Sequence, residues 1–149
     1  MKILSLNKKA QHNYQLLERY RAGIVLTGQE VKSIKAGRMN LQGAFVVVKN
    51  QELFLIGANV PPWQPKNAPP DYHPQRSRKL LLRKSEIRPL IGKTRQKGLT
   101  MIPLMVYTDK GKIKLEFWVA RGKKKVDKRE ELKKRAVERE IRKTLKRSL

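Results

Sequence analysis

Residues 99–120, LTMIPLMVYTDKGKIKLEFWVA, hold two apolar runs on either side of a short polar segment and decide the class of fold. In the second run every other residue is apolar: Ile113, Leu115, Phe117 and Val119. This two-residue period is typical of a strand with one buried face. Asp109 and Gly111 in the polar segment favour a tight turn. The pattern predicts an antiparallel hairpin of residues 99–107 and 112–120.

Further β-rich runs precede this hairpin. Residues 22–26 are one, and residues 44–48 and 52–56 flank a short polar turn typical of a second hairpin. Residues 76–84 enclose three leucines in basic residues. We expect a mainly β protein of about six short strands, arranged as an OB-like antiparallel β-barrel with flanking helices. Closure of a barrel removes exposed strand edges.

Two helices are expected beside the barrel. Thr27 followed by Glu30 has the spacing of a capping box and predicts a helix over residues 28–36. Ser85 is expected to cap the start of the second helix. Residues 61–74 contain six of the eight prolines and predict an irregular loop. Residues 1–9 are interpreted as a short basic arm.

The formal net charge of +24 on 149 residues limits the choice of partner. Solubility requires a net charge of only about 2–8 on a small domain. A polyanion with regularly spaced phosphates fits this excess, because each neutralised phosphate releases condensed counterions. The composition therefore predicts a nucleic-acid-binding protein.

The charge extends into a C-terminal segment of different composition. Residues 121–149 carry fourteen Lys or Arg and five Asp or Glu. Glu131 with Arg135, and Glu138 with Arg142, have helix-compatible spacing beside a narrow apolar stripe. We therefore expect a barrel over residues 1–120 and a basic tail over residues 121–149. The tail is expected to be disordered when free and helical against RNA; a permanent surface helix is the alternative.

The sequence also argues against several classes of function. The absence of cysteine excludes disulfides and thiolate chemistry and fits a cytoplasmic location. The two histidines have no cysteine partners, so we expect no metal site and no cofactor. We find no catalytic set, no secretory signal and no run of about 18 apolar residues, so neither an enzyme nor a membrane partner is expected.

Five blocks, in order along nearly the whole chain, resemble the SmpB family, the SsrA-binding proteins of bacterial trans-translation. The blocks are residues 7–14, residues 22–33 (AGIVLTGQEVKS), residues 52–55 (ELFL), residues 78–82 (RKLLL) and residues 120–129 (ARGKKKVDKR). Each block alone is weak, whereas the ordered set is specific.

The resemblance implies an OB-like barrel that binds the tRNA-like domain of transfer-messenger RNA (tmRNA, or SsrA RNA) and is not itself an enzyme. It implies delivery of that RNA to stalled ribosomes, ribosome rescue, and tagging of incomplete proteins for degradation. The implied ribosomal partner is the 30S decoding centre and mRNA channel, built from 16S rRNA, which the tail enters. Elongation factor Tu and alanyl-tRNA synthetase are implied as indirect partners through tmRNA.

The resemblance also implies site residues. Those matching the RNA-binding face are Asn7, Lys8, His12, Arg21, Gly23, Glu30, Lys32, Ser33, Lys79 and Leu81. Those matching the ribosome-facing tail are Gly122, Lys123, Lys124, Val126, Asp127, Lys128 and Arg129. Strand alternation predicts that Leu81 faces RNA while Leu80 and Leu82 point inward.

Two positions depart from the family pattern. Arg21 stands where the family usually has glutamate, so a group that can only donate or stack replaces an acceptor. Val126 stands where Tyr or His is common, which leaves apolar contact without stacking. Charge alone would equally support a general ribosomal or single-strand RNA-binding protein, with an RNA-processing enzyme as a third reading.

Overall fold

The computed structural model describes residues 1–123. The predicted tail residues Lys124, Val126, Asp127, Lys128 and Arg129, and the predicted tail helix, lie outside these described residues. The helices are α1 (Ala10–Asn13), α2 (Gly28–Lys35) and α3 (Lys84–Thr94), with a 3₁₀ turn at Pro65–Asn67. The strands are β1 (Lys2–Leu6), β2 (Tyr14–Ile24), β3 (Phe45–Lys49), β4 (Glu52–Ile56), β5 (Arg78–Leu81), β6 (Leu99–Asp109) and β7 (Lys112–Gly122).

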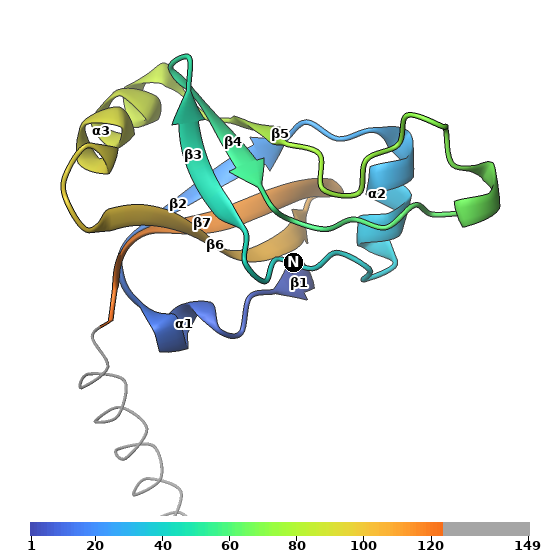
Figure 1. Cartoon of the computed structure of the whole chain (residues 1–149), viewed down its shortest axis with the longest axis horizontal. Helices are drawn as coiled ribbons and strands as arrows, with labels where there is room; N and C mark the ends of the chain where they lie inside the picture. The colour runs from blue at the N-terminus through green and yellow to red at the C-terminus, as the bar shows by residue number, and fades with distance from the viewer. Residues whose placement is uncertain (124–149) are drawn as a thin grey trace, which may run out of the picture.

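The seven strands form one antiparallel sheet that closes on itself. Their order is β1-β6-β3-β4-β5-β2-β7, and β7 pairs again with β6. Six strands, β2 to β7, therefore make a ring, and β1 pairs with the part of β6 that β3 leaves free. This arrangement confirms the expected OB-like barrel. Figure 1 shows α3 at one end of it and α2 with the proline-rich loop at the other.

Both predicted hairpins are present. β3 pairs with β4 around Asn50 and Gln51, and both turn residues have positive φ. β6 pairs with β7 around Lys110 and Gly111, where φ is again positive, as tight hairpin turns require. A two-residue turn thus fixes the register of each pair.

The barrel interior is apolar and well covered. Leu53, Leu55, Val106, Leu115 and Phe117 are fully buried in its main cluster. A second, smaller cluster lies beneath α1 and contains Ala10, Ile102, Leu104 and Ala120. This second cluster buries the other face of β7 at Ala120, so the expectation that β7 buries one face alone was incomplete.

Three predictions of local structure were wrong. Residues 2–6 form β1 within the segment predicted as a short basic arm, because the open edge of β6 supplies a hydrogen-bonding partner. β2 begins at Tyr14 and not at residue 22, since β7 pairs with it from Tyr14 to Gly23. Helix α3 begins at Lys84, and Ser85 does not cap it; Arg83 is the N-cap, with no side-chain hydrogen bond.

Helix α2 matches its prediction closely. The Thr27 hydroxyl accepts from the Glu30 backbone N–H at 3.3 Å, and the Glu30 carboxylate accepts from the Thr27 N–H at 2.9 Å. This reciprocal capping box fixes the start of the helix.

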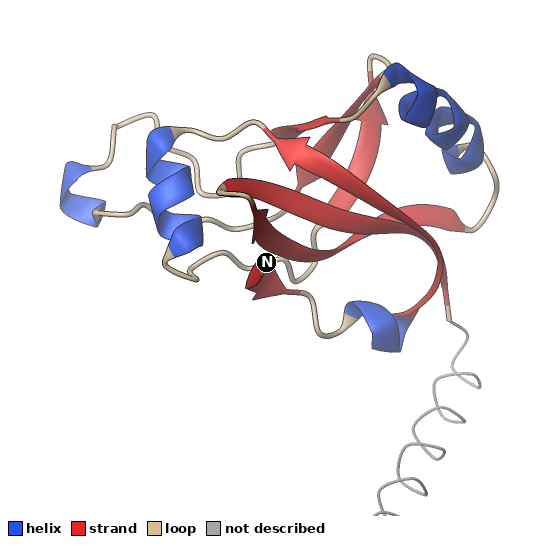
Figure 2. Cartoon of the chain, turned by 180° about the vertical axis from the view of Figure 1, so that it is seen from behind, coloured by secondary structure: helices blue, strands red, loops and turns tan. Residues whose placement is uncertain are grey.

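The proline-rich loop runs beside α2 and carries only one turn of 3₁₀ helix (Figure 2). No helix within residues 1–123 has the length and apolar character needed to cross a membrane.

Candidate nucleic-acid interface

Among the large apolar residues of the strands, Leu81 is the most exposed. Leu81 is 53% exposed, whereas Leu80 is 2% exposed. Leu81 pairs with Gly23 of β2. A Cβ atom at Gly23 would lie 3.3 Å from the Leu81 Cβ, so the glycine leaves room for the leucine to lie across β2. The predicted outward position of Leu81 is thus present in the structure.

Two hollows adjoin on either side of this leucine, and we call them together the Leu81 cleft. Their volumes are about 330 and 320 Å³, and they share Gly23, Leu81 and Lys114. Apolar side chains of β2, α2 and β7 line one hollow, among them Ile24, Val31 and Ile113. An apolar floor of this kind can accept a base face or a ribose.

The rim of the Leu81 cleft is strongly basic. Five cationic residues line it against one carboxylate, Glu86. These cations are Arg21, Lys35, Arg83, Lys112 and Lys114. The combination of apolar floor and basic rim suits a nucleic acid, whose bases need apolar or aromatic contact and whose phosphates need cations. Residues 1–123 hold no cluster of three or more side chains suited to bind a metal ion.

Arg21, Gly23 and Leu81 are the predicted RNA-binding residues that the fold brings together in this cleft. Lys32 is exposed on α2, one turn from the lining residue Lys35. Lys79 lies two residues from Leu81 on β5, but its ammonium pairs with Glu52 at 3.1 Å. These five residues thus share one region of the molecule.

Glu30 was predicted on the RNA-binding face, yet its side chain is 1% exposed. Its carboxylate receives a hydrogen bond from the Arg76 guanidinium at 2.6 Å and another from Arg78 Nε at 2.5 Å. Arg78 is itself fully buried and donates to the carbonyl oxygens of Ala58, Pro74 and Arg76. One carboxylate therefore joins α2 to β5 and, through Arg76, to the residues between the proline-rich loop and β5.

The protonation of Glu30 follows from these partners. Burial acts to raise the pKa of the carboxyl group. Hydrogen bonds from Arg76 and from the Thr27 backbone, with the charge of Arg78, outweigh it and hold the pKa below its ordinary value. The buried group is therefore a charged carboxylate at neutral pH.

Ser33 and Asn7 are also interior residues. The Ser33 hydroxyl donates to the Pro61 carbonyl at 2.6 Å, which ties α2 to the proline-rich loop a second time. The Asn7 amide donates to the Pro103 carbonyl at 3.0 Å, beside the irregularity in β6 that leaves Leu104 without a register partner in β7. Both side chains hold the frame of the barrel, and neither presents its hydrogen-bonding groups broadly to solvent.

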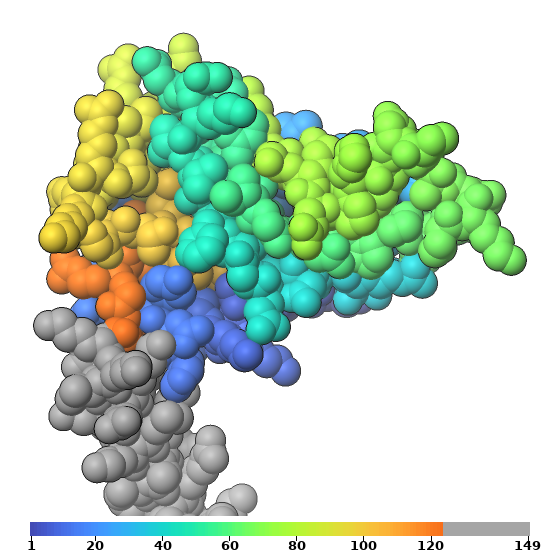
Figure 3. All heavy atoms as spheres, in the orientation of Figure 1, coloured from blue at the N-terminus to red at the C-terminus, as the bar shows by residue number. Residues whose placement is uncertain are grey.

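Lys8 and His12 lie near α1, in a different region from the Leu81 cleft. Lys8 is exposed and His12 half-buried. Close by, Lys123 N–H donates to the Asn13 carbonyl at 3.0 Å, so the end of the described chain rests against α1. Gly122 is part of β7. Figure 3 shows the N-terminal segment, coloured blue, against the orange end of β7.

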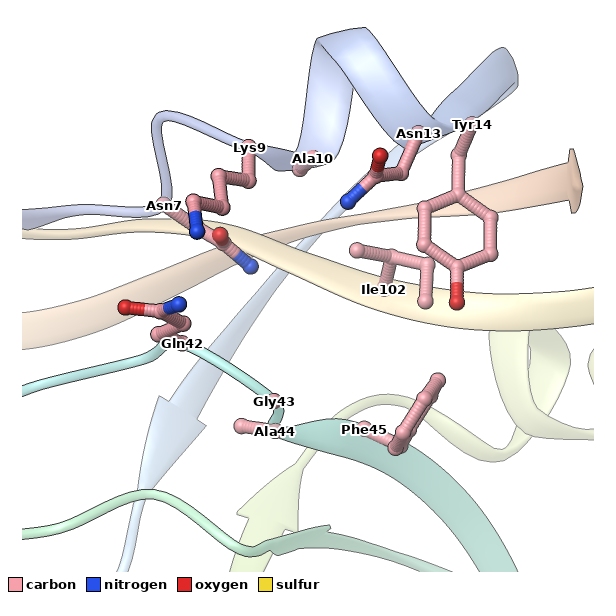
Figure 4. A pocket seen from close by; sticks show the side chains of 10 residues that line it. All are labelled: Asn7, Lys9, Ala10, Asn13, Tyr14, Gln42, Gly43, Ala44, Phe45 and Ile102. Carbon is pink, nitrogen blue, oxygen red and sulfur yellow. The ribbon is translucent and has the colours of Figure 1, made fainter. Parts of the chain in front are cut away.

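Sequence reasoning missed several lining residues. Lys112 and Lys114 alternate along β7 and Arg83 flanks the leucine run, which was a usable signal for a basic face. Asn13, Gln42 and Phe45 line a separate hollow beside α1 that no sequence pattern indicated (Figure 4). Three chain segments converge there, and convergence of this kind has no local signature.

Comparison with known proteins identifies consistent relatives. The model of the SmpB protein family matches residues 4–147. An SsrA-binding protein of Halothermothrix orenii is 46% identical over 146 residues, covering 98% of this chain and 94% of the relative. One from Acaryochloris marina is 47% identical, covering 98% and 95%. A chain from a solved structure described as "tmRNA-SmpB: a journey to the center of the bacterial ribosome" superposes with a TM-score of 0.67. It is 44% identical, and the match covers 80% of this chain and 84% of that one.

Proposed function

This chain belongs to the SmpB family, and from that premise we propose that it binds the tRNA-like domain of transfer-messenger RNA and delivers it to stalled ribosomes in trans-translation. The observation that carries the proposal is the near full-length similarity to proteins named SsrA-binding protein. The Leu81 cleft supplies a surface of matching chemistry. It offers an apolar floor for bases and a basic rim for phosphates.

Within this proposal, the predicted RNA-binding residues have two roles. Arg21, Leu81 and Lys32 make contact with the RNA, and Gly23 gives Leu81 the space to do so. Glu30, Ser33 and Asn7 act mainly by holding the barrel together, because each side chain is buried and hydrogen-bonded within the protein. Loss of an interior residue would displace the surface rather than remove a contact.

The wider partners belong to the proposal as well. The 30S decoding centre and mRNA channel receive the basic tail, whose residues include Lys124 and Asp127. Elongation factor Tu and alanyl-tRNA synthetase are reached indirectly, through tmRNA. The site of action is the cytoplasm, where ribosomes translate. The protein acts as a binding and delivery factor and not as an enzyme.

A gel-shift experiment tests the central proposal. Labelled tRNA-like domain is titrated with the full chain at about 0.15 M salt, with unlabelled tRNA and a plain single strand as competitors, because affinity for RNA depends steeply on salt. We expect neither competitor to displace the labelled tRNA-like domain from the protein. Equal competition by the single strand would instead favour a general RNA-binding protein, the second function that the net charge of +24 supports.

A further inference from the structure

A second hollow, which we call the α1 pocket, lies between α1 and the segment that leads into β3. Its volume is about 290 Å³. Figure 4 shows Asn7, Lys9 and Gln42 at one end of it, and Tyr14, Phe45 and Ile102 at the other. The pocket therefore has a polar end and a partly aromatic end, and three separate segments of the chain contribute to it.

The α1 pocket and the Leu81 cleft are separate places. They share no lining residue. Tyr14 in the pocket and Gly23 in the cleft are at opposite ends of β2. At about 3.3 Å per residue, the nine residue steps between them span up to about 30 Å. One nucleotide cannot occupy both.

The frame of the α1 pocket is held firmly. Ala10, Ala44 and Ile102 are each 2% exposed and form part of its wall. The Asn7 amide is fixed by its bond to the Pro103 carbonyl, and the Asn7 backbone N–H donates to the Leu104 carbonyl at 2.7 Å. A ligand would meet a largely preformed site, which lowers the cost of binding.

Two side chains that line the pocket, Asn13 and Gln42, are available to recognise a ligand. The side-chain amides of Asn13 and Gln42 make no hydrogen bond to any residue in 1–123, and each offers a donor beside an acceptor. Lys9 lines the pocket and no carboxylate does. The pocket is thus suited to a flat, partly polar group attached to an anionic backbone.

We propose that the α1 pocket holds one unstacked adenine base of an RNA partner. A side-chain amide of Asn or Gln reads adenine by a paired donor and acceptor, which Gln42 or Asn13 can supply. Tyr14, Phe45 and Ile102 offer the aromatic and apolar surface against which a splayed base packs. Lys9 and the exposed Lys8 are placed for the flanking phosphates. The proposal rests on the proposed RNA-binding function and adds a second contact to it.

The first test uses mononucleotides and the full chain. Adenosine monophosphate and uridine monophosphate are titrated separately, and the side-chain amide signals of Asn13 and Gln42 are followed by NMR. We expect adenosine monophosphate to shift both signals, with a clearly smaller effect of uridine monophosphate and little change at Gly23. Equal shifts by the two nucleotides, or shifts confined to the Leu81 cleft, would overturn the proposal.

The second test uses variants and identifies the RNA. Gln42→Ala and Asn13→Ala are compared with Gln96→Ala, an exposed glutamine in the turn before β6. Binding is measured separately to the tRNA-like domain and to 30S subunits loaded with a short mRNA. We expect the two pocket variants to lose about 5- to 100-fold in affinity for either the tRNA-like domain or the 30S subunit. The control should bind both like the wild type.

The outcomes separate this proposal from the proposed function. If the pocket variants bind both RNAs like the wild type while Leu81→Asp loses the tRNA-like domain, the adenine pocket is wrong and the function stands. If the wild type shows no preference for the tRNA-like domain, the proposed function fails. In that case the mononucleotide shifts still decide whether the α1 pocket binds adenine.

Discussion

Leu81 and Gly23 show how a surface is set by single residues. Leu80 and Leu81 are neighbours of identical chemistry, yet alternation along β5 buries one and exposes the other. Exposure of an isolated leucine is common and carries no meaning by itself. Leu81 differs from such a leucine because Gly23 leaves space beside it and the basic rim of the cleft surrounds it.

Leu81→Asp tests whether Leu81 contacts RNA. An aspartate there would place a negative charge on the apolar floor of the cleft and repel phosphates. We expect a loss in affinity for the tRNA-like domain of at least tenfold, with a melting temperature within a few degrees of wild type. Gel shift and thermal unfolding measure the two quantities. As a matched control, Leu80→Ala should cost about 2–5 kcal/mol of stability, because it empties a buried site. A large melting loss for Leu81→Asp would show that Leu81 is a core residue.

At the scale of elements, α2 is attached to the barrel by polar contacts as much as by apolar ones. Ile34 is fully buried in the core, while Glu30 and Ser33 bind β5 and the proline-rich loop. At the opposite end of the barrel, α3 packs through Leu90 and an ion pair between Lys93 and Glu18 of β2. The positions of both helices, and thus the walls of the Leu81 cleft, depend on these contacts.

Glu30→Gln is expected to loosen this attachment. The change removes the charge that Arg78 needs while leaving Arg78 buried, and loss of one partner of a buried ion pair costs about 3–5 kcal/mol. Chemical denaturation measures the loss. RNA affinity should fall as well, through displacement of α2. The matched exposed change Glu52→Gln, which affects a half-exposed pair, should alter stability by less than about 1 kcal/mol. Equal effects of the two changes would contradict the account.

The same residue predicts a dependence on pH. The pKa of Glu30 is lower in the folded protein than in the unfolded chain, where it is about 4.3. Its contribution to stability is therefore complete above that value and disappears as pH falls through the lower folded pKa. The wild type should lose stability on acidification below about pH 4, and Glu30→Gln should lose less. If the free energy of unfolding fell equally with pH in the two proteins, Glu30 would not be the cause of the loss.

For the whole molecule, charge and shape act together. A net charge of +24 attracts any polyanion, whereas the Leu81 cleft and the α1 pocket place apolar and polar groups at fixed points among those charges. Charge supplies affinity and the rigid surface supplies selectivity. The two contributions can be measured separately.

Salt dependence measures the first contribution. We expect log K for the tRNA-like domain to fall linearly with log salt, by roughly one unit of slope per phosphate contacted. Arg83→Ala and Lys112→Ala, which each remove a cation from the cleft rim, should each reduce the slope by about one. A flat dependence from low to physiological salt would disprove the electrostatic account.

A truncated chain separates body from tail. β7 continues to Gly122 and Lys123 bonds to α1, so truncation after Lys123 preserves the barrel better than truncation after residue 120. We expect residues 1–123 to fold and to bind the tRNA-like domain, but not to support tagging of stalled chains. The full-length double variant Asp127→Ala, Lys128→Ala should likewise bind the RNA and fail in tagging. Normal tagging by either protein, or a parallel loss of RNA binding, would refute this division.

The sequence by itself determined the class of fold, both hairpins and the capped start of α2. These features depend on neighbours within a few residues, as the alternation of Leu115 and Phe117 and the pair Thr27 and Glu30 illustrate. The charge of the chain and its resemblance to one family likewise needed no coordinates. Local periodicity and composition are readable because each element forms largely from its own residues.

Only the tertiary structure decided which predicted site residues are exposed on the surface and which are buried and support the fold. Glu30, Ser33 and Asn7 are engaged by Arg78, Pro61 and Pro103, partners 28 to 96 residues away along the chain. The α1 pocket likewise depends on Asn13 of α1 and Gln42 of the segment before β3 lining the same hollow. Such contacts arise from barrel closure, which brings together residues whose spacing in the sequence carries no periodic signal, and so no reading of neighbours could have found them.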